Sequence, residues 1–238
     1  MKNNHTLWLA LAGLSSSAML LAAPAPAPLE ASMALGYVGT SGNTDTSTFN
    51  TEFLLTLRSL QWTHNGKLQA MGSKQDSTTR AESYYLEDKS DYSLDANQYL
   101  FGKGTYLDDR FSGYRYQATV TTGYGRYMIN DDKLKLQAFA GVGYRQTAVN
   151  GLASDGNTIV TLGEKLAWSL SDTARLEQSL SSDIGSNLAT TVFEIALVSQ
   201  IIDRLSSKIA IQARNISEVP VGKKKTDTQT SVSLAYSF

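Results

Sequence analysis

The chain has 238 residues, of which 42% are apolar and 18% charged, and its formal net charge is −1. It contains no Cys, which excludes a disulfide framework, a thiolate metal site and a catalytic thiol. The near-neutral charge supplies no field that would attract nucleic acid, so no nucleic-acid partner is expected. No proline occurs between Leu29 and Val219. Because proline cannot donate to a β-ladder, this gap indicates strands that have neighbours on both sides.

The amino terminus has the pattern of a signal peptide. Lys2 is followed by an apolar stretch at 7–21 and by small residues and prolines at 22–31. We expect residues 1–31 to be a signal peptide and short linker, with cleavage between 22 and 31 and export from the cytoplasm. The alternative is an uncleaved membrane anchor, for which the apolar stretch is short against the ~20 residues of a spanning helix. No later segment resembles such a helix, so membrane insertion would require strands.

Apolar and polar residues alternate with a period of two through almost all of the remaining chain. The clearest cases are 114–124, 134–145 and the last strand, near 231–238. This period predicts strands that present two different faces. Further strands are predicted at 31–38, 47–58, 61–72, 83–92, 98–106, 158–169, 174–183, 190–201 and 205–215, which makes twelve with the three above.

The predicted connections alternate between short and long. Short turns fall near 59–60, 94–96, 130–132, 171–172 and 203–204, and longer loops at 39–46, 74–82, 108–113, 148–157, 185–189 and 216–225. Short turns on one rim and long loops on the other are typical of outer-membrane barrels, whose short turns face the periplasm. We therefore predict an all-β fold: an antiparallel transmembrane β-barrel of about twelve strands over 32–238. A soluble β-sandwich would show the same period.

The carboxyl terminus favours the barrel over the sandwich. Val232, Leu234, Tyr236 and Phe238 alternate along the final strand, as in the last strands of bacterial outer-membrane barrels. We expect these four residues to act as the signal for the barrel-assembly machinery. Expected surroundings are outer-membrane lipid and the outer membrane of a Gram-negative bacterium, and the oligomeric state is left open.

Two strands do not fit the alternation. In 158–169 the apolar set includes Glu164, and a carboxylate facing lipid is unfavourable. A bulge or the opposite register is expected there. In 98–106 Lys103 shares a face with Tyr99 and Phe101, so neither face is clearly apolar.

Several motifs resemble those of a known family. They are Ser41-Gly42-Asn43-Thr44-Asp45-Thr46, Asp108-Asp109-Arg110-Phe111-Ser112-Gly113-Tyr114, Gly123-Tyr124-Gly125, and Gly222 to Thr228 leading to Tyr236-Ser237-Phe238. The chain from about Ser32 to Phe238 thereby resembles the YdiY-like family, described as salt-induced outer-membrane proteins. The resemblance implies an outer-membrane barrel and a link to salt or osmotic stress. It implies no activity, because its motifs lie in loops and at strand ends.

Candidate catalytic and metal-binding residues are few. His64, the one histidine after the predicted signal peptide, shares its face with Trp62 and is read as an interfacial girdle residue rather than a catalytic base. Asp108 and Asp109 beside Arg110 are read as turn contacts rather than a cation site. Lys223 to Lys225 are read as a solvated loop. We expect no enzyme, no cofactor and no metal.

The face assigned to the lumen is the remaining functional candidate. Its predicted charges are Arg58, Lys67, Glu87, Lys89, Arg115, Lys135, Arg145, Lys165, Arg175, Glu177, Lys208 and Arg214, with Glu52, Asp91 and Glu194 as further acids. Basic residues predominate, which predicts a narrow, passive and weakly anion-selective pore. The alternatives are a closed barrel with a structural or envelope-interaction role and, third, an enzyme acting on outer-leaflet lipid.

Overall fold

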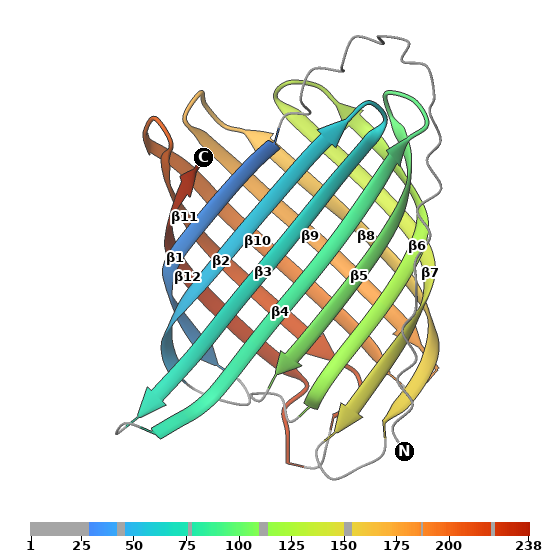
Figure 1. The fold of residues 1–238 in the computed structure, drawn as a ribbon, viewed down its shortest axis with the longest axis vertical. Helices are drawn as coiled ribbons and strands as arrows, with labels where there is room; N and C mark the ends of the chain where they lie inside the picture. The colour runs from blue at the N-terminus through green and yellow to red at the C-terminus, as the bar shows by residue number, and fades with distance from the viewer. Residues whose placement is uncertain are drawn as a thin grey trace, which may run out of the picture.

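The protein is a closed, twelve-stranded antiparallel barrel (Figure 1). The computed structural model describes residues 29–41, 46–75, 78–109, 114–149, 154–186, 188–219 and 222–238. The strands are β1 (Leu29–Ser41), β2 (Thr46–Ser59), β3 (Trp62–Gln75), β4 (Thr78–Ser93), β5 (Gln98–Asp109), β6 (Tyr114–Asn130), β7 (Leu134–Val149), β8 (Asp155–Ser169), β9 (Ala174–Gly185), β10 (Ala189–Ile202), β11 (Leu205–Ile216) and β12 (Thr226–Ser237). The predicted signal peptide lies outside the described residues, apart from 29–31.

Each strand pairs with its neighbours in sequence, and β1 pairs with β12 to close the ring. The register at this seam joins Ser32 to Ser237 and Ser41 to Thr228. All twelve predicted strands are confirmed, but most are longer than predicted. Residues 39–41 and 74–75, for instance, were expected in loops and instead extend β1 and β3. These segments have the composition of loops but form strands, because the hydrogen bonds of the β-ladder continue beyond the apolar part of each strand.

The short turns lie at one rim, at the top of Figure 1, together with the carboxyl terminus. Two of them contain a residue with positive φ, Leu60 at 49° and Asp203 at 38°, as tight hairpin turns require. In the turn between β4 and β5, the backbone N–H of Asn97 donates to Asp95 at 2.7 Å. Because this hydrogen bond stabilises the ionised carboxylate, the pKa of Asp95 lies below its usual value.

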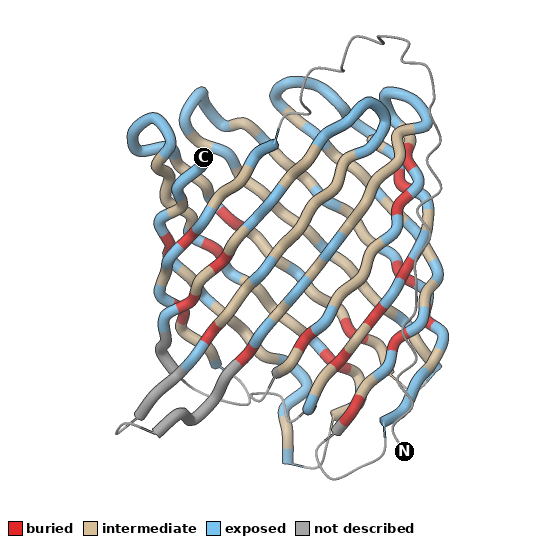
Figure 2. Tube along the Cα trace, viewed as in Figure 1, coloured by how far each residue is buried: buried red, intermediate tan, exposed pale blue. Residues whose placement is uncertain are grey.

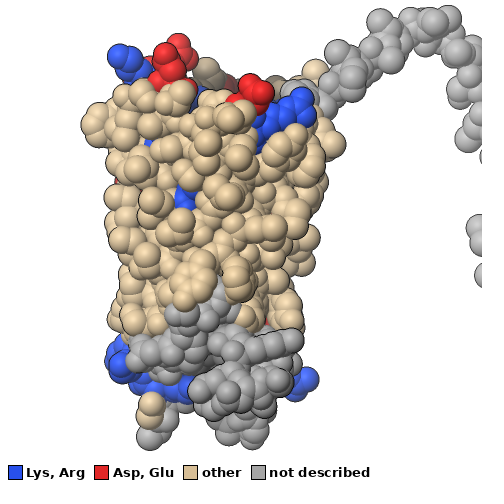
Figure 3. Space-filling model, turned by 90° about the vertical axis from the view of Figure 1, so that its left-hand side faces the viewer, with Lys and Arg blue, Asp and Glu red and all other residues tan. Residues whose placement is uncertain are grey.

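The outer face is apolar through the middle of the barrel. Exposed residues alternate with less exposed ones along the strands (Figure 2). Outward side chains such as Leu35, Val120, Leu162 and Val232 are largely exposed. On the face drawn in Figure 3, charged side chains gather at the two ends and the band between them is almost free of charge. Such a band suits the hydrocarbon core of a membrane.

Aromatic residues mark the short-turn side of this band. Trp62 stacks on His64, with ring centroids 5.7 Å apart, and also contacts Tyr92 at 5.0 Å. Tyr236 contacts Phe238 at 5.3 Å near the end of β12. Aromatic girdles of this kind lie where lipid headgroups meet hydrocarbon. The outward, exposed positions of Val232, Leu234, Tyr236 and Phe238 fit this surface; their recognition by assembly machinery stays a prediction.

The structure corrects the expectation for the strand around Glu164. The pairings of β8 with β7 and β9 run without a bulge, so Glu164 stays in register with Leu162 and Leu166 and faces outward. Its carboxylate accepts a hydrogen bond from the amide of Gln178 at 2.9 Å. This hydrogen bond from the neighbouring strand gives the outward carboxylate a polar contact, which the sequence pattern of one strand did not reveal.

The outward pair Glu164 and Gln178 leads to a prediction about stability. Replacing Glu164 and Gln178 together with Leu should stabilise the barrel in phospholipid by about 1 kcal/mol, because a carboxylate on the lipid face is unfavourable. Urea unfolding in vesicles measures the change. The single variant Leu162→Glu, which adds an outward carboxylate on the same strand, should destabilise. A double variant less stable than the native chain would contradict this account.

In the described ranges there is no helix with the length and apolarity needed to cross a membrane.

Candidate functional site in the barrel lumen

Aromatic rings line one wall of the lumen, and glycines make room for them. On β5, Tyr99 and Phe101 face inward and are 4% and 3% exposed. The Tyr99 ring lies against Gly125, where an added Cβ would come within 2.1 Å of it. Gly163 seats Phe139 in the same way, at 2.4 Å. The rings therefore lie close against the wall, which only glycine permits at these positions.

The facing of β5 is thereby settled: Lys103, Tyr99 and Phe101 all point into the lumen, in register with Lys89, Ser93 and Asp91 of β4. Lys89 forms an ion pair with Asp91 at 2.6 Å. Its ammonium group also lies 4.9 Å from the centre of the Tyr99 ring and 5.4 Å from that of Phe101. These cation–π contacts explain why aromatic rings and a lysine share one face.

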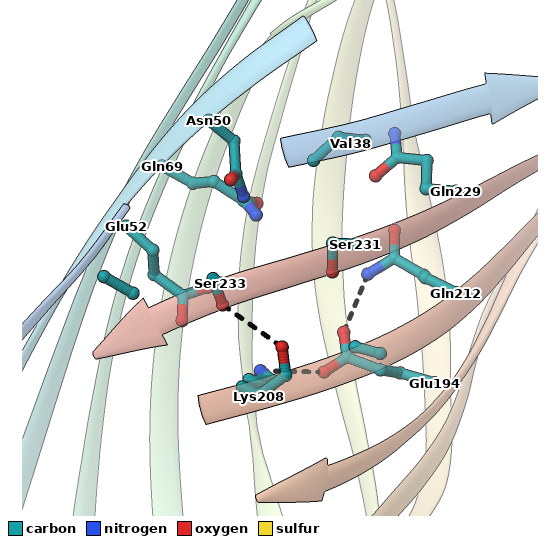
Figure 4. A pocket seen from close by; sticks show the side chains of 12 residues that line it. Val38, Asn50, Glu52, Gln69, Glu194, Lys208, Gln212, Gln229, Ser231 and Ser233 are labelled. Carbon is teal, nitrogen blue, oxygen red and sulfur yellow. Dashed lines mark hydrogen bonds and ion pairs between the residues drawn. The ribbon is translucent and has the colours of Figure 1, made fainter. Parts of the chain in front are cut away.

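A second cluster occupies the wall formed by β1–β3 and β10–β12 (Figure 4). Lys67 pairs with Glu52 at 3.1 Å, and Lys208 pairs with Glu194 at 3.3 Å. Gln212 donates to the second oxygen of Glu194 at 2.9 Å. Lys67 also interacts electrostatically with Glu194, so the two pairs form one network although β3 and β10 are not neighbours.

A cavity of about 30 Å³ lies within this second cluster, lined by amide and hydroxyl groups as well as by the charges. Its lining includes Asn50, Gln69, Gln229, Ser231 and Ser233. The side-chain oxygen of Asn50 is buried and has no hydrogen-bond partner among the described residues. A polar cavity of this size has room for water but not for a larger solute.

The carboxylate of Glu87 on β4 is the centre of a third cluster of polar side chains. The Tyr85 hydroxyl donates to its carboxylate at 2.6 Å. Lys165, Lys103 and Lys67 all act on it electrostatically. Within the described residues, neither Lys103 nor Lys165 forms an ion pair. Lys103 lies directly across from Lys89, a like-charge pair that raises the need for a counter-charge.

Closely packed side chains also line the lumen toward the long-loop rim. Ile159 and Thr161 are 1% and 0% exposed, and Thr161 donates to Asp183 at 2.7 Å. Arg145, 2% exposed, donates to the backbone oxygen of Leu188 at 2.6 Å. Toward the short turns, inward side chains such as Lys165 are exposed to solvent. The interior is thus exposed to solvent around Lys165 and closely packed around Arg145 and Thr161.

The structure places the charges predicted for the lumen in three settings. Most face inward within the barrel: Lys67, Glu87, Lys89, Arg145, Lys165, Lys208 and Arg214. Arg58 and Arg175 form exposed ion pairs, with Glu30 and Glu177 respectively, near the short turns. Lys135 is exposed beside a short turn, and Arg115 is exposed at the irregularity between Tyr114 and Tyr116.

Sequence reasoning missed several inward charges. They include Glu30, Lys103, Asp183 and Asp227. Glu30 and Asp227 lie on extensions of the predicted strands, and Asp183 lies on the same face as Glu177, which was the available signal. With them, basic side chains outnumber acidic ones by a smaller margin than predicted.

The loop motifs fall largely outside the described residues. Ser41 is exposed at the end of β1, and Asp108 and Asp109 end β5. Gly42, Asn43, Arg110, Phe111 and Gly113 lie outside the described residues. Of the loop lysines, Lys224 and Lys225 are exposed. Over the described ranges, no group of three or more His, Asp or Glu side chains is placed to hold a metal ion.

His64 lies on the outer face, not in the lumen. Its Nδ1 and the Ser90 hydroxyl are 2.7 Å apart, and the two residues are cross-strand partners. Both positions are next to the Trp62 girdle contact. The bond satisfies two polar groups at the membrane interface, which agrees with the girdle reading of this histidine.

Comparisons with known proteins agree with this architecture. A family model described as "Protein of unknown function, DUF481" matches residues 33–238. The uncharacterized protein YdiY of Escherichia coli (strain K12) is 30% identical over 219 residues, covering 91% of this chain and 86% of YdiY. The NanC porin structure has a TM-score of 0.57 at 7% identity, covering 86% of this chain and 98% of that one. The structure of the KdgM porin in complex with disordered oligogalacturonate has a TM-score of 0.50 at 11% identity, and the match covers 87% of this chain and 99% of that one. The chain therefore has the closed β-barrel fold seen in these small porin structures.

Proposed function

Since the chain belongs to the DUF481 family, whose description assigns no function, we propose from its lumen that it is a narrow passive pore with weak anion selectivity. The observation that carries the proposal is the presence of two inward lysines, Lys103 and Lys165, that form no ion pair. A cation held in a confined, low-dielectric passage attracts anions and repels cations.

The arrangement of the remaining charges supports a weak rather than a strong preference. Lys67, Lys89 and Lys208 are each matched by a carboxylate, at 3.1, 2.6 and 3.3 Å. Such pairs contribute little net field beyond their immediate surroundings. The selectivity would then depend on Lys103 and Lys165, which share the single carboxylate of Glu87. Twelve strands lie between barrels filled by side chains and wide porins, so the bore is small.

Planar bilayers test this proposal directly. The purified barrel should give discrete conductance steps, and its reversal potential in a potassium chloride gradient should favour chloride. Lys103→Gln combined with Lys165→Gln should abolish the preference by removing the two unpaired charges. Arg58→Gln, which removes a paired charge at the exposed rim, is the matched control and should leave the preference nearly unchanged. Absence of conductance steps in the native protein would overturn the proposal.

A closed barrel with a structural role is the second candidate, and one observation favours it. Buried side chains such as Ile159, Thr161 and Arg145 pack the lumen toward the long-loop rim. If this packing is static, the same bilayers will show no steps for the native chain or for any lysine variant. The fold would then serve the envelope through its outer surface and loops.

A further inference from the structure

Glu87 stands in the lumen amid groups of the kind that bind a carboxylate. The Tyr85 hydroxyl donates to it at 2.6 Å. Lys67 of β3 is the direct cross-strand partner of Glu87, and Lys103 lies two positions from its β5 partner. Lys165 faces the lumen from β8 and also acts on Glu87 electrostatically. Charge-assisted contacts of this type are the strong ones in a protein interior.

Two of these lysines have no other carboxylate. Lys67 is already paired with Glu52 at 3.1 Å. Lys103 and Lys165 form no ion pair within the described residues, and Lys103 is in register with Lys89, a like charge. Lys165 also acts unfavourably on Lys89. One carboxylate therefore compensates two cations, which leaves this part of the lumen with excess positive charge.

The neighbouring lysines cannot take over this role. Lys89 is held by Asp91 and by the Tyr99 and Phe101 rings. Lys208 is held by Glu194, whose other oxygen accepts from Gln212. Lys103 and Lys165 are consequently the inward lysines best placed to bind a solute, and Glu87 is the group with which that solute competes.

We propose that Glu87 occupies, with its own side chain, a site at which the pore binds the carboxylate of an organic acid, and that small organic carboxylates are the solutes it admits. This inference rests on the proposed pore. A solute carboxylate would replace that of Glu87 like for like in charge and in hydrogen-bonding capacity, with Tyr85 as the neutral donor and Lys103 and Lys165 as the cations. Lys165 is exposed, which leaves this side of the site accessible to solvent.

Removing the internal carboxylate tests the inference. Glu87→Gln should raise the permeability of acetate relative to sodium about fivefold in planar bilayers, since the two lysines lose their only counter-charge. Glu177→Gln is the matched control, because Glu177 pairs with Arg175 at the exposed rim; its effect should be below about 1.5-fold. Adding Lys103→Gln and Lys165→Gln to Glu87→Gln should cancel the increase.

A binding measurement keeps the inference testable without conduction. In Glu87→Ala the lysines face an empty space, so added sodium acetate should raise the unfolding temperature of this variant more than sodium chloride does. The native barrel should not distinguish the two salts. Equal effects of both salts on Glu87→Ala would overturn the inference.

The outcomes separate this inference from the pore itself. A conducting native barrel whose acetate permeability is the same in Glu87→Gln retains the pore and removes the carboxylate site. A silent native barrel that conducts acetate only as Glu87→Gln retains the site and removes the open pore. Silence in both, with no acetate effect on Glu87→Ala, overturns both proposals.

Discussion

Gly36→Ala should destabilise the barrel by about 3 kcal/mol, because the seam between β1 and β12 has no room for a methyl group. A Cβ on Gly36 would lie 2.5 Å from the Ser233 Cβ, 2.6 Å from the Val232 carbonyl oxygen and 2.8 Å from the side-chain oxygen of Asn50. One of these atoms belongs to the backbone of β12, so relief requires the two strands to separate. Urea unfolding in phospholipid vesicles, followed by gel migration without boiling, measures the loss.

Gly39→Ala provides the control for this substitution. Gly39 is on the same strand, and a Cβ there would meet only the Thr230 carbonyl oxygen, at 4.0 Å. Gly39→Ala shares with Gly36→Ala the reduced conformational freedom of the unfolded chain but not the steric conflict. Its stability should therefore stay within about 0.5 kcal/mol of the native value. Equal stability of the two variants would show that the seam tolerates the added volume.

Lys67→Met should cost about 3 kcal/mol, for an electrostatic reason. The side chain of Glu52, Lys67's partner at 3.1 Å, is only 10% exposed. Lys67 also interacts with Glu194 and Glu87. Its removal leaves a nearly buried carboxylate without a cation, and the desolvation of that charge is no longer offset. Chemical denaturation in vesicles measures the effect.

Two further variants identify the cause of that loss. Glu52→Gln combined with Lys67→Met should recover much of the stability, since the unpaired charge is gone. Arg58→Met breaks a pair whose side chains are 48% and 63% exposed, and it should cost less than about 1 kcal/mol. A Lys67→Met variant no less stable than Arg58→Met would contradict the role given to the buried network.

The architecture was predictable because it depends on a period that the sequence displays. The alternation in 114–124 and 134–145 identified the two faces correctly, and the short turns near Leu60 and Asp203 fixed the hairpins. The outward position of Glu164 was not predictable from β8 alone. Its partner Gln178 lies on the next strand, and the pairing depends on a register that a single strand does not specify.

The site was less accessible to sequence reasoning than the fold. Lys103 could not be assigned a face because aromatic residues suggest lipid, whereas here Tyr99 and Phe101 turn inward onto glycines of β6 and β7. The charged residues of the lumen could be identified from the sequence, but their partners could not. Residues such as Lys67 and Glu194 interact across the lumen, between strands that are not neighbours. Which lysines remain unpaired is a property of the closed ring and of no single segment.

The β1–β12 seam also determines the order in which the barrel can form. Eleven of the twelve pairings join strands adjacent in the chain, whereas the seam joins Ser32 to Ser237. Local hairpins can zip early, but closing the last pairing confines almost the whole chain, at an entropic cost of about 5 kcal/mol for a loop of this length. Until β12 arrives, the curled sheet has two unpaired edges, each able to recruit a strand from another molecule. The last dozen residues therefore decide whether the nearly complete sheet ends as a ring or as an aggregate.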